Sequence, residues 1–440
     1  MTTGPNLSGR PDGSPVAAAR HVPGPRRADD RRIAAASLVV AAGYLVAAAA
    51  AAATGAPDRP ATAWLPLHLA LAGGASTAIA GVMPFFVAAL SASRPAPAWT
   101  RTAAAVLVAV GAALVATHAL QPGLSAGVPL SVMGGVAFLG GIAATALSVR
   151  ASGGGGLMAR RPIVVRGYLL ALANVGVGAT LGTLVLADWG PVVSRLAVVR
   201  PAHAWTNLIG FVSLVIVATL LHFLPTVLGT RIGPRRPATV AVSGVGLGAP
   251  LVVVGLLARL GAIADAGAAL TLAGVVGLIA EARAVYAARG RWTTNASWHL
   301  VASGGLLAGV AWFALGAGLA SGLVLAWSVG AVGDATAWRS DVVAAPIVIG
   351  WVVQVLVASW THLLPSIGPG GPVKHAVQRA VLGRAAEPRL VALNLGTALV
   401  AVGWPLGIAP LAGLGLALVA AAVVASAGLA WSAVAVRTRG

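Results

Sequence analysis

Long apolar stretches separated by short polar segments run through the chain from Ile33 to Val436. Each is about 20 residues long, which is what an α-helix needs to cross a hydrocarbon core of about 30 Å. The pattern predicts an all-α fold, a polytopic transmembrane helical bundle of about twelve spans. The predicted spans are 33–54, 65–93, 102–120, 127–149, 163–187, 203–228, 238–259, 263–286, 299–320, 341–364, 389–407 and 410–436.

Two segments lie outside this pattern. Residues 1–32 are rich in Pro, Gly, Ala and Arg, and we interpret them as a disordered cytoplasmic tail preceding a transmembrane domain over 33–436. A signal peptide is the alternative for the first apolar stretch, but its basic region would be unusually long. Segment 321–340 is short and polar at Asp334 and Arg339, which favours a surface or re-entrant helix.

The loop charges test the number of spans independently. Loops rich in Arg or Lys alternate with loops that are poor in them along the whole chain, as the positive-inside rule requires. Twelve spans satisfy this alternation, whereas adding or removing one would break it downstream. We therefore expect a multi-pass protein of the cell membrane with both the N- and C-termini in the cytoplasm.

Composition narrows the class of function. Of the 440 residues 58% are hydrophobic and only 9% are charged, so most of the chain lies in the lipid bilayer. The net charge of +19 is spread over the loops, so we expect no nucleic-acid partner. Because the chain contains no cysteine, any metal would be held by nitrogen or oxygen ligands.

Six histidines lie in or at the ends of predicted spans, and ionisable groups inside a bilayer are costly and usually functional. The alternative is that each imidazole bonds a backbone carbonyl or lies at headgroup level. The predicted orientations sort the six by depth. Metal ligands are expected near the outer face and cofactor ligands near the inner face: His68, His118 and His203 outside, and His222, His299 and His362 inside.

His203 and His222 are on one predicted helix, about 28 Å apart at 1.5 Å per residue. They cannot bind one ion, so the sequence proposes one site at each face, or one site and a set of interfacial histidines. Neutral imidazole suits copper, iron and zinc. Two facing histidines suit haem iron, and three with an open position suit copper or zinc, so haem and copper are the cofactors we expect.

Two local motifs recur. The segment His222-Phe-Leu-Pro-Thr matches His362-Leu-Leu-Pro-Ser, and Gly210 pairs with Gly350 upstream. This match predicts that His222 and His362 lie close together near the inner face, on neighbouring helices. A shorter pattern, His-Leu-x-x-x-Gly-Gly, begins at His68 and at His299. Its glycines leave room either for a flat macrocycle or for a neighbouring helix.

Polar residues near these histidines could support them. Asn207 follows His203 by one turn, although an interhelical hydrogen bond is the favoured interpretation for its amide. Glu281 lies near the inner end of its span and could orient an inner imidazole.

Twelve spans with these membrane histidines resemble the haem–copper oxidase subunit I superfamily, and more closely the NnrS-like membrane proteins. The resemblance rests on His68, on His203 with Asn207 and Gly210, and on His362. It implies haem, copper and nitric-oxide metabolism. The chain departs from oxidase subunit I because span 238–259 has no histidine and no tyrosine follows His203, which argues against a proton-pumping oxygen reductase.

Three functions remain open at this stage. The first is an integral membrane protein that binds haem, copper or both, acts in electron transfer or nitric-oxide handling and meets a redox partner protein; if it is an enzyme, it is an oxidoreductase. The second is a small-solute or metal-ion transporter, in which the histidines bind cargo transiently. The third is a scaffold subunit without a site.

Overall fold

The computed structural model of this protein describes residues 25–54, 60–91, 93–120, 127–152, 162–232, 236–290, 299–367 and 371–436. In these residues the structure is an all-α bundle without a strand. Among the described residues, eleven helices are long and apolar enough to cross a membrane, and a twelfth span results if the bent pair formed by α17 and α18 counts as one. The predicted fold class and the number of spans are therefore confirmed.

The spans fall into three consecutive groups of four. The first group contains α1 (Pro25–Thr54), α2 (Pro60–His68) with η1 (Leu69–Ala75) and α3 (Ser76–Ser91), α4 (Ala98–Leu120) and α5 (Gly127–Ser152). The second contains α7 (Pro162–Leu186), α9 (Leu196–Asn207) with η2 (Leu208–Ser213) and α10 (Leu214–Val227), α11 (Arg236–Ala258) and α12 (Gly261–Ala287). The third contains η4 (Leu300–Gly304) with α14 (Gly305–Ser328), α15 (Ser340–Ala344) with η6 (Ala345–Val353) and α16 (Gln354–Ile367), then α17 (Pro372–Leu382) with α18 (Ala386–Gly403), and α19 (Ala409–Ala435).

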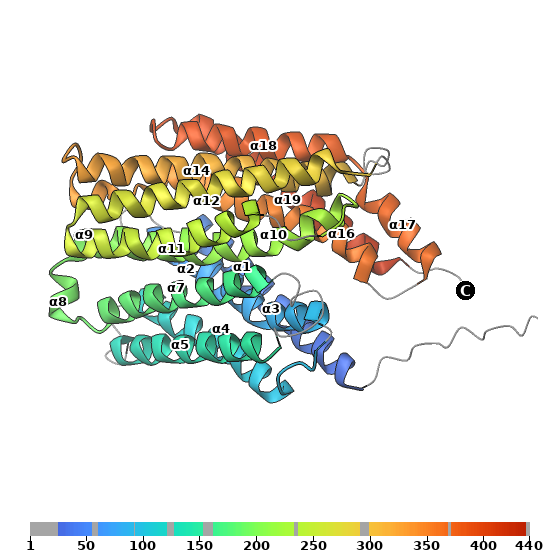
Figure 1. The fold of residues 1–440 in the computed structure, drawn as a ribbon, viewed down its shortest axis with the longest axis horizontal. Coiled ribbons are helices and arrows are strands. Elements are labelled where there is room, and N and C mark those ends of the chain that lie inside the picture. Colours follow the sequence, from blue (N-terminus) through green and yellow to red (C-terminus); the bar gives the residue numbers. More distant parts are fainter. Residues whose placement is uncertain are drawn as a thin grey trace, which may run out of the picture.

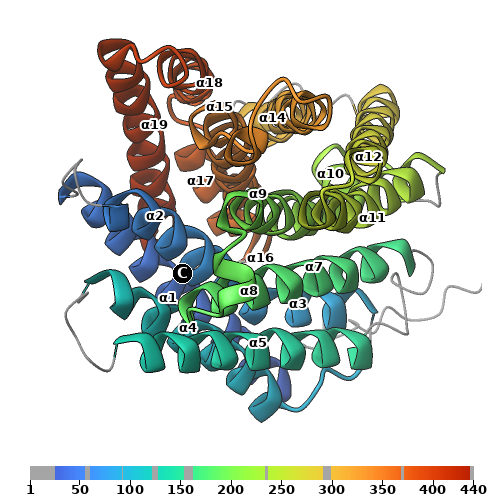
Figure 2. The same ribbon diagram turned by 90° about the vertical axis from the view of Figure 1, so that its left-hand side faces the viewer.

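The last two spans of each group form a tight hairpin in which glycines bring the backbones together. A Cβ added to Gly111 in α4 would lie 2.6 Å from the carbonyl oxygen of Gly134 in α5, and one added to Gly244 in α11 would lie 2.5 Å from Cα of Gly274 in α12. Gly396 of α18 faces Gly415 of α19 in the third hairpin. Small residues at the interface permit this close approach of helices in lipid. Figure 2 shows the three hairpins on three sides of the bundle, with α9 near the middle.

The second span of each group is interrupted by a π-helical segment, namely η1, η2 or η6, and a fourth segment, η4, opens the ninth span. One extra residue per turn widens a helix locally, and such segments are frequent at functional sites. Two of the four begin at the leucine that directly follows a histidine of the short repeated motif, His68 for η1 and His299 for η4. The repeated sequence therefore corresponds to a repeated local structure.

The surface and the centre of the bundle differ as expected for a protein in lipid. Large apolar side chains cover the periphery, where Val46 is 70% and Trp431 is 78% exposed. In the span formed by α9, η2 and α10, by contrast, 89% of the most apolar stretch is buried. This apolar periphery fits association with a lipid bilayer, and it leaves the span that carries His203 and His222 at the centre.

Three predicted boundaries change. Residues 321–328 continue the ninth span to Ser328, so segment 321–340 is not a separate surface or re-entrant helix; only the short 3₁₀ turn η5 (Asp334–Ala337) precedes α15. The sixth span begins at Leu196 rather than at His203, which places His203 in its second turn. Helix α1 begins at Pro25, within the segment interpreted as a tail, and residues 1–24 lie outside the described residues.

Candidate metal-binding histidine pairs

The outer pair consists of His68, the last residue of α2, and His203 in α9. Their imidazole rings are nearly parallel, with an interplanar angle of 16° and centroids 5.9 Å apart. The rings of Trp64 and His68 are nearly perpendicular, with centroids 4.5 Å apart. The structure thus brings together two of the three histidines that the loop charges placed near the outer face.

Hydrogen bonds fix the tautomer of both outer histidines. Nδ1 of His68 lies 2.9 Å from the carbonyl oxygen of Trp64, and Nδ1 of His203 lies 2.9 Å from that of Gly178. A carbonyl oxygen can only accept, so each Nδ1 carries the proton and each neutral ring keeps its lone pair on Nε2. Within the described residues neither Nε2 has a hydrogen-bond partner. A ligating histidine commonly has this arrangement, in which its second nitrogen donates to a carbonyl.

Glycines of α7 form the surface against which His203 packs. A Cβ on Gly182 would lie 3.1 Å from Cε1 of the His203 ring. One turn earlier, a Cβ on Gly178 would lie 2.5 Å from Nδ2 of Asn207, whose amide donates to the backbone carbonyl of His203 at 2.7 Å. Gly178 therefore serves twice, because its carbonyl accepts from the His203 ring and its missing side chain makes room for Asn207.

The ring separation allows one ion between the two histidines. With a metal–nitrogen bond of about 2.0 Å and about 1.1 Å more to each ring centre, two imidazoles on one ion have centroids about 5 Å apart at a tetrahedral angle and about 6 Å apart on a straight line. The 5.9 Å between His68 and His203 falls in this range. An ordinary aromatic pair has a similar separation, so the two directed Nδ1 bonds are the feature that favours a metal.

Where the sequence predicts two groups of three histidines, the described part of the chain brings two histidines together in each group. His118 lies near the end of α4, and its side chain is outside the described residues. Among the residues that the structure describes, no three His, Asp or Glu side chains form a group that could hold a metal ion. A third outer ligand from His118 stays a prediction.

The inner pair consists of His299, which precedes η4, and His362 in α16. Both are buried, and their ring centroids are 6.2 Å apart at an interplanar angle of 47°. The ring of Phe223 meets that of His362 edge to face at 5.7 Å, so the inner ends of α10 and α16 are neighbours, as the shared motif predicts. His222 is buried beside Phe223, and an ion shared by His222 and His362 stays a prediction.

The glycines of the short motif are occupied by neighbouring helices. A Cβ on Gly73 would collide with the ring of Tyr44, and one on Gly305 would lie 2.8 Å from Cβ of Ala358. Close to the inner pair, the described residues form a cavity of about 10 Å³ between Gln354 and Arg389, room for about one water. Of the two uses considered for these glycines, helix packing is therefore the one realised, and the packing fits a bare ion better than a porphyrin.

The two supporting polar residues have different surroundings. Asn207 donates within its own helix rather than across a helix interface, so the interhelical interpretation was wrong, and its amide instead helps to hold the backbone at His203. Glu281 is buried in α12, a helix that packs on the helix carrying His222. Its proposed role in orienting an inner imidazole stays a prediction.

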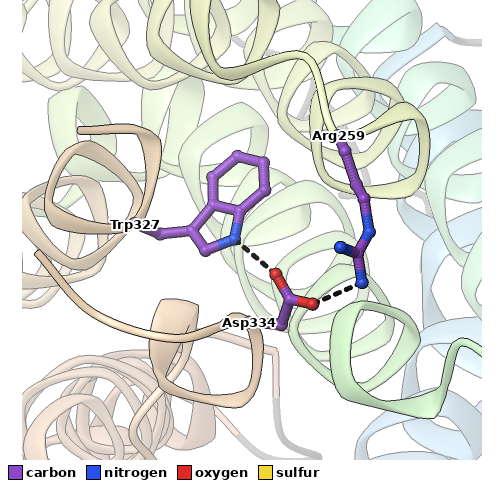
Figure 3. A network of polar contacts seen from close by, with 3 residues as sticks. All are labelled: Arg259, Trp327 and Asp334. Atoms are coloured by element: carbon purple, nitrogen blue, oxygen red, sulfur yellow. Dashed lines mark hydrogen bonds and ion pairs between the residues drawn. The ribbon is translucent and has the colours of Figure 1, made fainter. Parts of the chain in front are cut away.

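A polar network lies at the end of the bundle that carries the outer pair. Asp334 in η5 accepts from Arg259 at 2.6 Å and from the indole of Trp327 at 2.9 Å, as Figure 3 shows. Four residues later, the ring of Trp338 packs edge to face on the buried Trp205, with centroids 6.1 Å apart. Because Trp205 is two residues from His203, this connector covers the helix that positions the outer pair.

Sequence reasoning missed Gly178, Gly182 and Trp64, which hold the outer rings in place. A backbone carbonyl that accepts a hydrogen bond has no signature in the sequence, and glycine is too common here for single positions to stand out. Comparison with known proteins adds no relative: no protein-family model matches the chain, and no curated protein matches it. The likeness to NnrS-like proteins therefore remains an expectation.

Proposed function

We propose that this chain is an integral membrane copper-binding protein that acts in electron transfer or in the handling of nitric oxide. The observation that carries the proposal is the outer pair, in which two Nδ1–H groups are fixed on carbonyls and two Nε2 lone pairs are left for an ion. The inner pair, His299 and His362, would hold a second ion. The same proposal places the protein in the cell membrane with both termini in the cytoplasm.

Copper is preferred for chemical reasons. Imidazole binds copper well, and the chain offers neither thiolates nor a convergent carboxylate group among its described residues. If one ion bridges each pair, separations of 5.9 and 6.2 Å correspond to a wide N–metal–N angle, about 145° and about 180°, which suits a two-coordinate monovalent copper ion. Copper supplies one-electron chemistry, which both proposed activities use. Haem at the inner pair is the less favoured form of the proposal, since the adjacent glycines are filled.

Metal content of the purified full-length protein tests the proposal. After expression with ample copper and haem, elemental analysis should find copper, and His68→Ala or His203→Ala should each remove about one equivalent. His375→Ala, a histidine of α17 outside both pairs, is the matched control and should leave the copper content unchanged. Protein that is free of metal would refute the proposal.

Transport of a metal ion is a second candidate, favoured by the interrupted helices. Transporters bind cargo near broken spans, and here η1 and η4 each begin next to a histidine of a pair. Proteoliposomes loaded with a copper-sensitive dye separate the two functions. Copper that crosses the bilayer and is lost on dialysis indicates transport, whereas copper that stays bound at a fixed ratio indicates a resident ion.

A further inference from the structure

Helix α17 lies between α16 and α18, at the end of the bundle where α19 also ends (Figure 1). Its 11 residues are bent by 49° against α18. Helix α18 alone has 18 residues and a length of about 27 Å, close to the thickness of a hydrocarbon core. Because α18 nearly suffices to cross the bilayer, α17 is free to lie at the membrane surface.

One face of α17 is fixed to the bundle. Gln378 is buried, and its amide donates to the backbone carbonyl of Ala433 in α19 at 3.1 Å. Val381 and Leu382 bury their side chains against the same residue. The helix therefore has a set orientation, and its other face always points away from the protein.

That outward face is apolar. Val373 is 71% and Val377 is 40% exposed, and Ala376 and Ala380 are exposed beside them. Residues three and four apart lie on one side of a helix, so these four form a continuous stripe. In water such a stripe on a short helix would be unfavourable, but in the acyl boundary of a bilayer it is stabilising.

Cations accompany the stripe. Lys374 and Arg379 lie on α17, and Arg384 follows in the turn to α18. Within the described residues, neither Lys374 nor Arg384 takes part in an ion pair. Between 371 and 389 the only acidic residue is Glu387. An exposed apolar stripe with cations beside it complements a surface of acyl chains and phosphates, and it complements an aqueous anion much less well.

We propose that α17 lies in the cytoplasmic leaflet and binds the headgroups of anionic phospholipids. Val373 and Val377 enter the acyl boundary, and the ammonium of Lys374 and the guanidinium of Arg384 bind lipid phosphates. A basic residue near such a surface strengthens binding about fivefold, so the two cations together account for about 25-fold.

Native mass spectrometry of the full-length protein in detergent, titrated with phosphatidylglycerol or phosphatidylcholine, tests the proposal. The variant Lys374→Gln/Arg384→Gln should bind phosphatidylglycerol at least tenfold more weakly than the unaltered protein. Arg195→Gln/Arg200→Gln removes two exposed cations at the opposite end and is the matched control, expected to bind normally. Val373→Ser/Val377→Ser keeps the cations and should also weaken binding.

Three results would overturn the proposal: unchanged affinity of the Lys374→Gln/Arg384→Gln variant, equal binding of phosphatidylcholine by the unaltered protein, or displacement of the lipid by inorganic phosphate at matched concentration. The last result would assign α17 to a soluble anion. The cytoplasmic side assigned to α17 rests on the topology in the proposed function. Because none of these positions touches a histidine pair, copper content is unaffected by every outcome, so failure of the lipid proposal and failure of the copper proposal are distinguishable.

Discussion

Substitution of Gly178 by alanine tests the reasoning on the outer pair without touching a ligand. The added Cβ would lie 2.5 Å from Nδ2 of Asn207 and closer still to its Oδ1, a separation that real Cβ atoms do not show. Asn207 is short and is held by its bond to the carbonyl of His203, so it cannot turn away without losing that bond. Either Asn207 or the α7 backbone moves, and the acceptor of His203 Nδ1 moves with the backbone.

The size of the effect follows from these contacts. Overpacking by one methyl group costs about 1–3 kcal/mol of stability. Displacing a partner that orients a ligating histidine typically lowers metal affinity 10- to 100-fold, or about 1.4–2.8 kcal/mol. The two effects differ in kind, since the first appears in the free protein and the second only when copper is present.

Copper affinity measured by competition with a chelator, together with thermal unfolding of the metal-free protein, separates these effects. Gly176→Ala is the control, because it adds the same methyl group to α7 where no atom lies within 4 Å. In Gly178→Ala/Asn207→Ala the collision is gone, and part of the affinity should return. If Gly178→Ala binds copper as tightly as Gly176→Ala, the proposed role of Gly178 is wrong.

Three further predictions concern the inner pair, the topology and the packing. His362→Ala should remove the inner ion and leave copper at the outer pair intact, because about 28 Å separates the depths of the two pairs. Elemental analysis should find one equivalent of copper in this variant and none in His203→Ala/His362→Ala. Single cysteines introduced for labelling with an impermeant reagent in intact cells should react at the external positions and not at the internal ones; the external positions are Gln121, Arg195 and Asp334, and the internal ones are Arg160, Arg235 and Lys374. Gly244→Ala places a Cβ 2.5 Å from Cα of Gly274 and should cost about 1–3 kcal/mol in thermal unfolding, whereas Gly322→Ala, which meets nothing, should be neutral.

Hydropathy and loop charge predicted the spans well because both depend on composition over about 20 residues. They misplaced segment 321–340 because the polar Asp334 and Arg339 dominated its average, although residues 321–328 simply extend α14 by about two more turns. The π-helical segments could not be predicted in this way, since one extra residue per turn leaves the apolar content unchanged.

Depth sorting correctly grouped His68 with His203 and His299 with His362, because position along a span is set by the sequence alone. The rotation of a span about its own axis is not set by local sequence. It decides that Phe223 faces His362, and it depends on packing between spans far apart in the chain. The hydrogen-bond acceptor for His203 is the carbonyl of Gly178, 25 residues earlier on another helix, and a local sequence pattern cannot predict such a partner.

The glycine-lined hairpins also bear on how the protein is made. In each hairpin the two helices are consecutive in the chain, so α4 can meet α5, and α11 can meet α12, as soon as the second helix leaves the insertion machinery. The spans that carry the histidines depend on distant partners, since His68 must await α9 and His299 must await α16. Membrane insertion would therefore complete each hairpin as soon as its second helix emerges, whereas His68 would wait until α9 and His299 until α16 before either pair could form.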